Sequence, residues 1–127
     1  MLPYHLDNLS PDKFEKTVNR LVREIQKDYP TCNLIYGRGL SGAMIIPALA
    51  AKLKISFAII RKRGKSHGNP VEYAEFADIN EDNSCEAVFV DDLIDTGKTY
   101  RSCKRRLKEF LNDEGYSVNF LGEVLYL

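Results

Sequence analysis

Two neighbouring carboxylates and a turn of small residues stand close together in this chain, and together they could bind a charged sugar. Asp91 and Asp92 follow the apolar run 87–90, and the turn 96–99 comes shortly after them. Backbone N–H groups and hydroxyls at the start of a helix bind anions, helped by the helix dipole. Carboxylates instead accept hydrogen bonds from hydroxyls or hold a cation. The segment therefore predicts a site for a sugar phosphate.

The segment has two other interpretations. The acids and the turn could form a solvated loop that caps a helix, since Asp and Thr are common helix caps. The end of the segment, Gly97-Lys98-Thr99, also resembles the end of a P-loop. A P-loop needs glycine five residues before Gly97, where this chain has Asp92, and a carboxylate there would repel the phosphates. The P-loop interpretation is therefore rejected.

Residues 88–99 resemble the phosphoribosyl diphosphate signature of the type I phosphoribosyltransferases. Both consist of an apolar strand, two acids, two apolar residues, a variable position and Thr-Gly-x-Thr. The resemblance implies that Asp91 and Asp92 hold the ribose hydroxyls, directly or through Mg²⁺. It implies a catalytic role for Asp92 and for Asp95, which fills the variable position as in members that act on 6-oxopurines and would handle a proton of the base. The residues that would hold the 5′-phosphate are Thr96, Gly97, Lys98 and Thr99.

The loop at 37–42 supports two interpretations. Its pattern Gly-x-Gly-x-x-Gly, with Arg61 at the end of the next strand, is typical of an NADP-binding Rossmann motif. That alternative leaves residues 88–99 unexplained. Arg38-Gly39 instead resembles the Arg-Gly of bacterial xanthine-guanine phosphoribosyltransferases. This resemblance implies that Arg38 and Gly39 bind the diphosphate and that the Gly37–Arg38 peptide is cis.

A basic segment begins at Arg61, where four of five successive residues are cationic. It could be a solvated loop, or a lid that closes over the diphosphate. It resembles the flexible loop of adenine phosphoribosyltransferases, which implies that Lys62 and Lys65 stabilise the departing charge during catalysis. The loop indicates adenine and Asp95 indicates a 6-oxopurine, so a purine acceptor is favoured without a choice between them.

Composition limits the remaining possibilities. The 127 residues suit a single domain spanning 1–127, with a core at about 33–115 and a flexible loop at about 61–77. The chain has 18 basic and 18 acidic residues, so its net charge predicts no bulk attraction to nucleic acid or membrane. It shows no signal peptide or membrane span, and its three separated cysteines lack metal-ligand spacing. These features predict a cytoplasmic protein with reduced thiols.

Hydrophobic periodicity predicts alternating helices and strands. One expected helix begins at Pro11, and two further helices cover 41–53 and 98–112. The expected strands are 33–36, 55–60, 71–77, 87–90 and 118–126. This order predicts an α/β fold with a mostly parallel twisted sheet flanked by helices on both faces. Ligands of such sheets bind beyond the carboxyl ends of the strands, where the acidic pair lies.

The expected function is Mg²⁺-dependent transfer of a phosphoribosyl group from phosphoribosyl diphosphate to a nitrogenous base, with a purine favoured. The terminal segments that form a base-gripping hood in the family are short here, so a minimal hood is expected. The alternative is a non-catalytic regulatory protein that binds phosphoribosyl diphosphate. Such a protein needs a basic face for nucleic acid, but the cluster 104–108 is interpreted as the solvated side of a helix. By analogy with the family, the chain is expected to form a homodimer.

Overall fold

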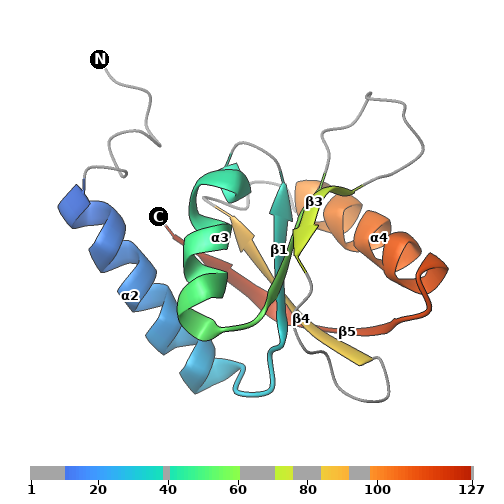
Figure 1. Cartoon of the computed structure of the whole chain (residues 1–127), viewed down its shortest axis with the longest axis horizontal. Coiled ribbons are helices and arrows are strands. Elements are labelled where there is room, and N and C mark those ends of the chain that lie inside the picture. The colour runs from blue at the N-terminus through green and yellow to red at the C-terminus, as the bar shows by residue number, and fades with distance from the viewer. Residues whose placement is uncertain (1–10, 39–40, 61–70, 76–83, 92–97, 127) are drawn as a thin grey trace.

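The computed structural model describes residues 11–38, 41–60, 71–75, 84–91 and 98–126. The helices and strands follow one another in the order that the sequence predicts (Figure 1). Within these ranges the helices are α2 (Pro11–Asp28), α3 (Ser41–Leu53) and α4 (Lys98–Asp113). The strands in the same ranges are β1 (Leu34–Arg38), β2 (Ser56–Ile60), β3 (Val71–Glu75), β4 (Ser84–Asp91) and β5 (Ser117–Leu125).

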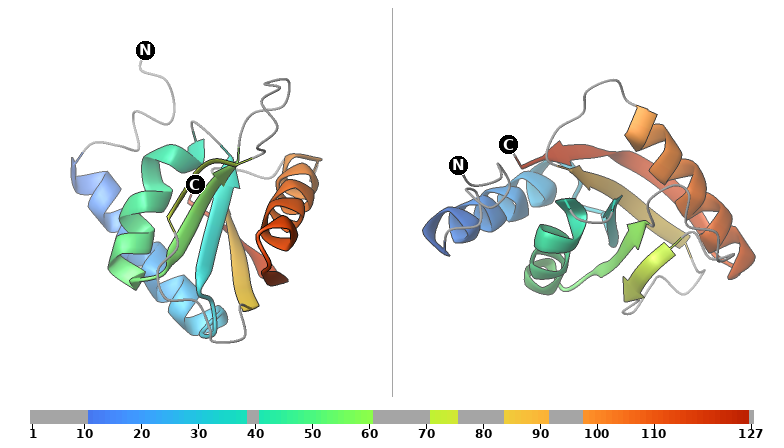
Figure 2. Two further views of the ribbon diagram at one scale, coloured as in Figure 1. Left: turned by 45° about the vertical axis from the view of Figure 1, so that its right-hand side comes forward. Right: turned by 90° about the horizontal axis from the view of Figure 1, so that it is seen from above.

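The strands form one sheet in the order β3-β2-β1-β4-β5. The four strands β2, β1, β4 and β5 are parallel, and β3 adds an antiparallel edge. Helices α2 and α3 cover one face of the sheet and α4 covers the other (Figure 2). The expected fold class, a mostly parallel sheet with helices on both faces, is confirmed.

The core divides into two layers because successive strand residues point to opposite faces. Ile35 and Val88 pack with the buried side chains of α2 and α3. Tyr36 and Phe89 pack instead with the buried residues of α4, which are Cys103, Leu107 and Leu111. Strands buried on both faces carry near-continuous apolar runs, which is why β1, β2 and β4 are recognisable in the sequence.

The element boundaries differ from the prediction mainly where pairing extends a strand. Strand β1 continues to Arg38, because Gly37 and Arg38 pair with Ile59 and Ile60 of β2. The expected cis peptide between Gly37 and Arg38 is wrong, since the described residues contain no cis peptide bond. A trans bond keeps both residues in the extended register of the sheet. Strand β4 begins at Ser84, opposite Ser117 and before the expected strand 87–90.

The end of α4 agrees with its sequence signal. Gly115 has a φ of 88°, a left-handed conformation that glycine adopts without the steric cost of a Cβ. Its N–H donates to the carbonyl of Asn112, and the N–H of Tyr116 donates to the carbonyl of Leu111. These bonds satisfy carbonyls left open at the helix end and turn the chain into β5. Within the described ranges, no helix is long and apolar enough to cross a bilayer.

Candidate functional site

The strand order changes direction between β1 and β4, and the helices that follow these two strands cover opposite faces. Helix α3 follows β1 on the face shared with α2, whereas α4 follows β4 on the other face. The two connections therefore diverge at the carboxyl ends of β1 and β4. In parallel α/β sheets, this switch point is where ligands bind. Arg38 is the last residue of β1 and Asp91 is the last residue of β4.

Arg38 and Asp91 meet at this switch point. The Arg38 Nε atom lies 3.8 Å from Oδ2 of Asp91. The parallel register pairs Tyr36 of β1 with Phe89 of β4, and two further residues along each strand bring Arg38 opposite Asp91. Both side chains follow the alternation that directs Tyr36 and Phe89 toward the α4 face. The sheet therefore positions the two charges without the help of a loop.

The two partners differ greatly in exposure, which gives them different chemical possibilities. The Asp91 side chain is 1% exposed, whereas the Arg38 side chain is 45% exposed. A buried carboxylate needs a nearby positive charge or hydrogen-bond donors, because burial disfavours its ionised form. Arg38 supplies one such charge and also reaches solvent, where it can meet an anion. Asp91 can accept hydrogen bonds or contribute an oxygen to a cation.

The main chain fixes the position of Asp91, and its carboxylate lies near α4. The N–H of Tyr126 donates to the carbonyl of Asp91 at 3.0 Å, so the end of β5 fixes the end of β4. Cys103 of α4 lies within electrostatic reach: burial is the main cause that raises its pKa to about 11, and the Asp91 carboxylate adds to the effect. The Asp91 side chain therefore faces the second turn of α4.

An aromatic layer lies beneath the charged pair. The rings of Tyr36 and Phe89 are 5.3 Å apart, and those of Phe89 and Tyr100 are 5.1 Å apart. Tyr36 and Phe89 come two residues before Arg38 and Asp91, so the strand alternation directs all four side chains to the same face. Such ring pairs stabilise beyond their buried area and resist displacement. They form a rigid base from which the two charges project.

The residues present suit a metal ion held partly by substrate. Within the described ranges, no group of three or more His, Cys, Asp or Glu side chains could hold a metal ion. Mg²⁺ commonly takes one or two protein carboxylates and completes its shell with water and substrate phosphates. Asp91 offers a carboxylate at the right edge of the sheet. Asp91 could therefore supply one carboxylate oxygen to a Mg²⁺ ion of this kind.

The structure brings together two of the predicted site residues, Arg38 and Asp91, and places two more at the start of α4. Lys98 and Thr99 are the first two residues of that helix. The remaining predicted site residues lie outside the described residues: Gly39, Lys62, Lys65, Asp92, Asp95, Thr96 and Gly97. Sequence reasoning missed the Arg38–Asp91 pairing and the aromatic layer. The available signal was that both charges end buried strands and follow an aromatic residue by two positions.

Comparison with curated proteins gives orotate phosphoribosyltransferases as relatives. No family model matches the chain. An orotate phosphoribosyltransferase of Streptococcus agalactiae is 30% identical over 101 residues, which cover 75% of this chain and 46% of that protein. The chain thus spans about half the length of the curated relatives it matches.

Solved structures show the same fold. An adenine phosphoribosyltransferase from Saccharomyces cerevisiae superposes with a TM-score of 0.62 at 22% identity, over 91% of this chain and 70% of that one. An orotate phosphoribosyltransferase from Aeropyrum pernix has a TM-score of 0.64 at 15% identity, over 98% and 78% of the two chains. The motif at 88–99, the curated relatives and the shared fold together show that this chain belongs to the type I phosphoribosyltransferase family.

Proposed function

We propose that this protein transfers the 5-phosphoribosyl group of phosphoribosyl diphosphate to a nitrogenous base and releases diphosphate. The observation that carries the proposal is the buried Asp91 carboxylate beside Arg38, at the carboxyl ends of β1 and β4. A carboxylate and a solvent-reaching guanidinium at one switch point suit a ligand that has both hydroxyls and anionic groups. Phosphoribosyl diphosphate has both.

In this proposal, each part of the site takes one part of the donor. Asp91 and Asp92 bind the ribose hydroxyls, and the turn 96–99 with the first N–H groups of α4 binds the 5′-phosphate. Fixing both ends of the ribose phosphate holds C1 in place for attack. Arg38 contacts the diphosphate, together with the backbone at Gly39.

Charge develops on the diphosphate as its bond to C1 breaks. Arg38 and the sequence-predicted lid residues Lys62 and Lys65 stabilise this charge, because cations aimed at developing charge lower the barrier. Asp95 takes or directs the proton of the attacking base. A Mg²⁺ ion held by Asp91 and Asp92 would neutralise further negative charge when bound.

We propose a purine as the acceptor, on the basis of Asp95 and the basic loop in the sequence. Orotate is the second candidate, because the curated relatives are orotate phosphoribosyltransferases. The protein would act as a homodimer. The main alternative function is regulatory binding of phosphoribosyl diphosphate without transfer.

The test is diphosphate release from phosphoribosyl diphosphate and Mg²⁺ with adenine, guanine, hypoxanthine, xanthine, uracil or orotate. Release with one base supports transfer and identifies the acceptor. Saturable donor binding without release from any base supports the regulatory alternative. Absence of both binding and release, in protein shown to be folded, contradicts the proposal. Asp91→Asn is the matched control, since it removes the buried charge and keeps the side-chain shape.

A further inference from the structure

Helix α2 carries a surface that the proposed function does not use. Its buried residues Val18, Leu21 and Ile25 are at most 2% exposed and fix which side of the helix faces the core. The opposite side carries five exposed cations, which we call the basic stripe: Lys13, Lys16, Arg20, Arg23 and Lys27. At about 100° per residue, all five fall within an arc of about 80°, and no other residue of α2 falls inside it.

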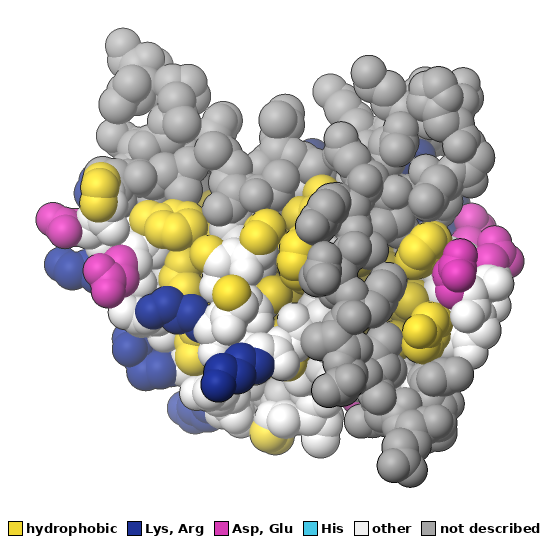
Figure 3. Space-filling model, in the orientation of Figure 1, with side chains coloured by type: hydrophobic (Ala, Val, Ile, Leu, Met, Phe, Trp, Pro, Cys, Tyr) yellow, Lys and Arg dark blue, Asp and Glu magenta, His cyan; other side chains and the backbone are white. Residues whose placement is uncertain are grey.

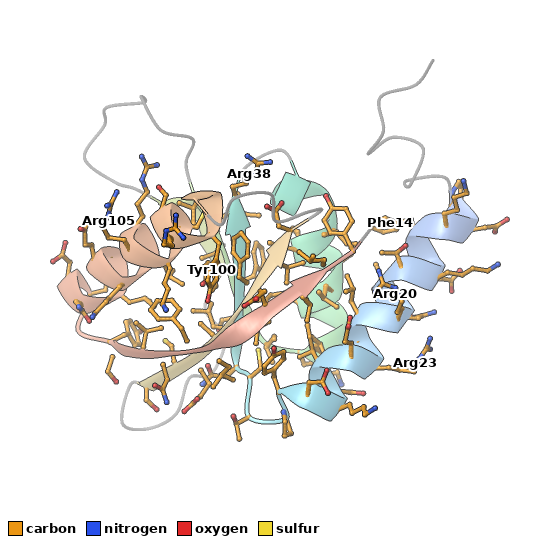
Figure 4. All side chains as sticks on the ribbon, turned by 180° about the vertical axis from the view of Figure 1, so that it is seen from behind. Phe14, Arg20, Arg23, Arg38, Tyr100 and Arg105 are labelled. Carbon is orange, nitrogen blue, oxygen red and sulfur yellow. The ribbon has the colours of Figure 1, made fainter. Side chains whose placement is uncertain are left out.

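The stripe is long and continuous. Successive members are three or four residues apart, so the row extends about 21 Å along the helix at 1.5 Å per residue. Lys52 of α3 donates to Oδ1 of Asn19 at 3.3 Å, which adds a further cation beside the row. In Figure 3, Lys and Arg side chains gather over α2 and the adjoining end of α3. Figure 4 shows Arg20 and Arg23 on this helix.

Internal contacts account for only part of the stripe. Arg20 lies 3.4 Å from Glu24 Oε2 and donates to the carbonyl of Leu125. Like charges four residues apart, such as Lys16 and Arg20 or Arg23 and Lys27, repel one another and weaken the helix. A face that served only solubility would mix both signs of charge. The segregation therefore indicates a ligand with many negative charges.

We propose that the basic stripe of α2 binds the phosphate backbone of nucleic acid, without reading its sequence. A duplex carries one negative charge per about 1.7 Å of its axis, so about 21 Å offers roughly 12 phosphates to five cations. The neutral total charge of the chain conceals this attraction, because the stripe excludes acids from one surface. The net charge of the chain predicts no bulk attraction to nucleic acid, whereas the local charge of the basic stripe predicts binding at this one surface.

Two other anionic partners fit the stripe less well. Membrane-binding amphipathic helices bury their apolar side in the bilayer, but that side of α2 is already buried in the core. Protein interfaces are rich in aromatic residues and poor in lysine, whereas the arc holds only Lys and Arg. Phosphate groups need only positive charge and N–H donors, which the stripe supplies.

The test measures binding of a short fluorescein-labelled DNA duplex and an RNA duplex of the same sequence by anisotropy, between about 50 and 200 mM salt. The stripe variant Lys16→Gln/Arg23→Gln removes two cations that no internal hydrogen bond of the described residues uses, and Gln favours helix. We expect its affinity to fall about tenfold and the slope of log K against log salt to decrease by about 2. The exchange variant Lys16→Arg/Arg23→Lys keeps the charge and should bind as the unmodified protein does.

A second variant separates the stripe from general electrostatics. Arg105→Gln/Lys108→Gln removes the same charge from exposed positions of α4 and should leave binding unchanged. An equal loss in both double variants, or none in the stripe variant, would overturn the proposal. Absence of duplex binding would overturn it too. Binding of poly-glutamate or of phosphatidylserine vesicles instead would assign the stripe to an acidic protein or to a membrane. Thermal unfolding of each variant checks that the fold is intact, and the outcome is independent of phosphoribosyl transfer.

Discussion

The Nε atom of Arg38 lies 3.8 Å from Oδ2 of Asp91. This ion pair connects the carboxyl ends of β1 and β4 at the switch point of the sheet. The pair combines a 45% exposed cation with a 1% exposed carboxylate. Loss of either partner should therefore have different effects on stability and on activity. The two effects can be separated by substitution.

Arg38→Met removes the cation and leaves the buried carboxylate less compensated. We expect a loss of about 1–2 kcal/mol in the free energy of unfolding, less than for a fully buried pair because Arg38 reaches water. Asp91→Asn should leave stability nearly unchanged while diphosphate release falls by about 100-fold or more. Urea unfolding and a release assay measure the two quantities. Combining both substitutions should restore stability but not activity, and a stable Arg38→Met variant would contradict this account.

Asp92→Asn tests the second acid of the motif. We expect diphosphate release to fall strongly, because the carboxylate would hold the ribose hydroxyls, while the urea midpoint stays close to that of the unmodified protein. The comparison is with Asp113→Asn, an exposed acid at the end of α4 that should change neither quantity. Unchanged turnover in the Asp92 variant would remove that residue from the site.

Tyr36→Phe should leave the protein as stable as before or more stable. The Tyr36 side chain is fully buried, and its hydroxyl has no hydrogen-bond partner among the described residues. A buried hydroxyl without a partner costs about 1–3 kcal/mol, while the ring contacts with Phe89 and Phe120 survive the change. Tyr36→Ala, which removes those contacts, should destabilise by about 3–5 kcal/mol. A marked loss of stability in the Phe variant would show that the hydroxyl has a partner after all.

Much of the fold could be predicted because its signals are local. Helix α3 spans Ser41–Leu53 as predicted, and Cys103, Leu107 and Leu111 are buried as their helical spacing indicates. The Arg38–Asp91 pair could not be derived in this way, since it depends on β1 and β4 being neighbours in register. Strand order is a long-range property that periodicity does not contain.

Two other features show where sequence reasoning failed. The resemblance implied a cis peptide at Gly37–Arg38, but pairing of both residues with β2 keeps the bond extended. The basic stripe is present in the sequence at helical spacing, but a total charge of zero gives no sign of it. The burial of Val18, Leu21 and Ile25 confirms that the side with the five cations faces solvent. Net charge describes a chain, whereas binding depends on a surface.

The three thiols should be unreactive while the protein is folded. Burial raises the pKa of Cys32, Cys85 and Cys103 to about 11, from 9.0. At about pH 8 the thiolate, which is the reactive form, is therefore scarce, so Ellman's reagent should react slowly until urea unfolds the chain. Above pH 9 the unfolded chain loses thiol protons that the folded chain retains, so stability should fall as pH rises from 9 toward 11. Rapid labelling of folded protein would contradict this burial.

Gly122→Ala tests a close approach between β5 and the end of α2. A Cβ at Gly122 would collide with the ring carbons and hydroxyl of Tyr29. Overpacking of this kind commonly costs about 1–3 kcal/mol, because the neighbour must leave its preferred position. Tyr29→Leu in the Gly122→Ala background should recover part of that loss in urea unfolding. Gly115→Ala is the comparison, because its added Cβ meets no atom within 4 Å. Any loss of stability in this variant comes from the φ of 88° at residue 115, so Tyr29→Leu should not relieve it. Equal relief at both glycines would show that the collision with Tyr29 is not the cause.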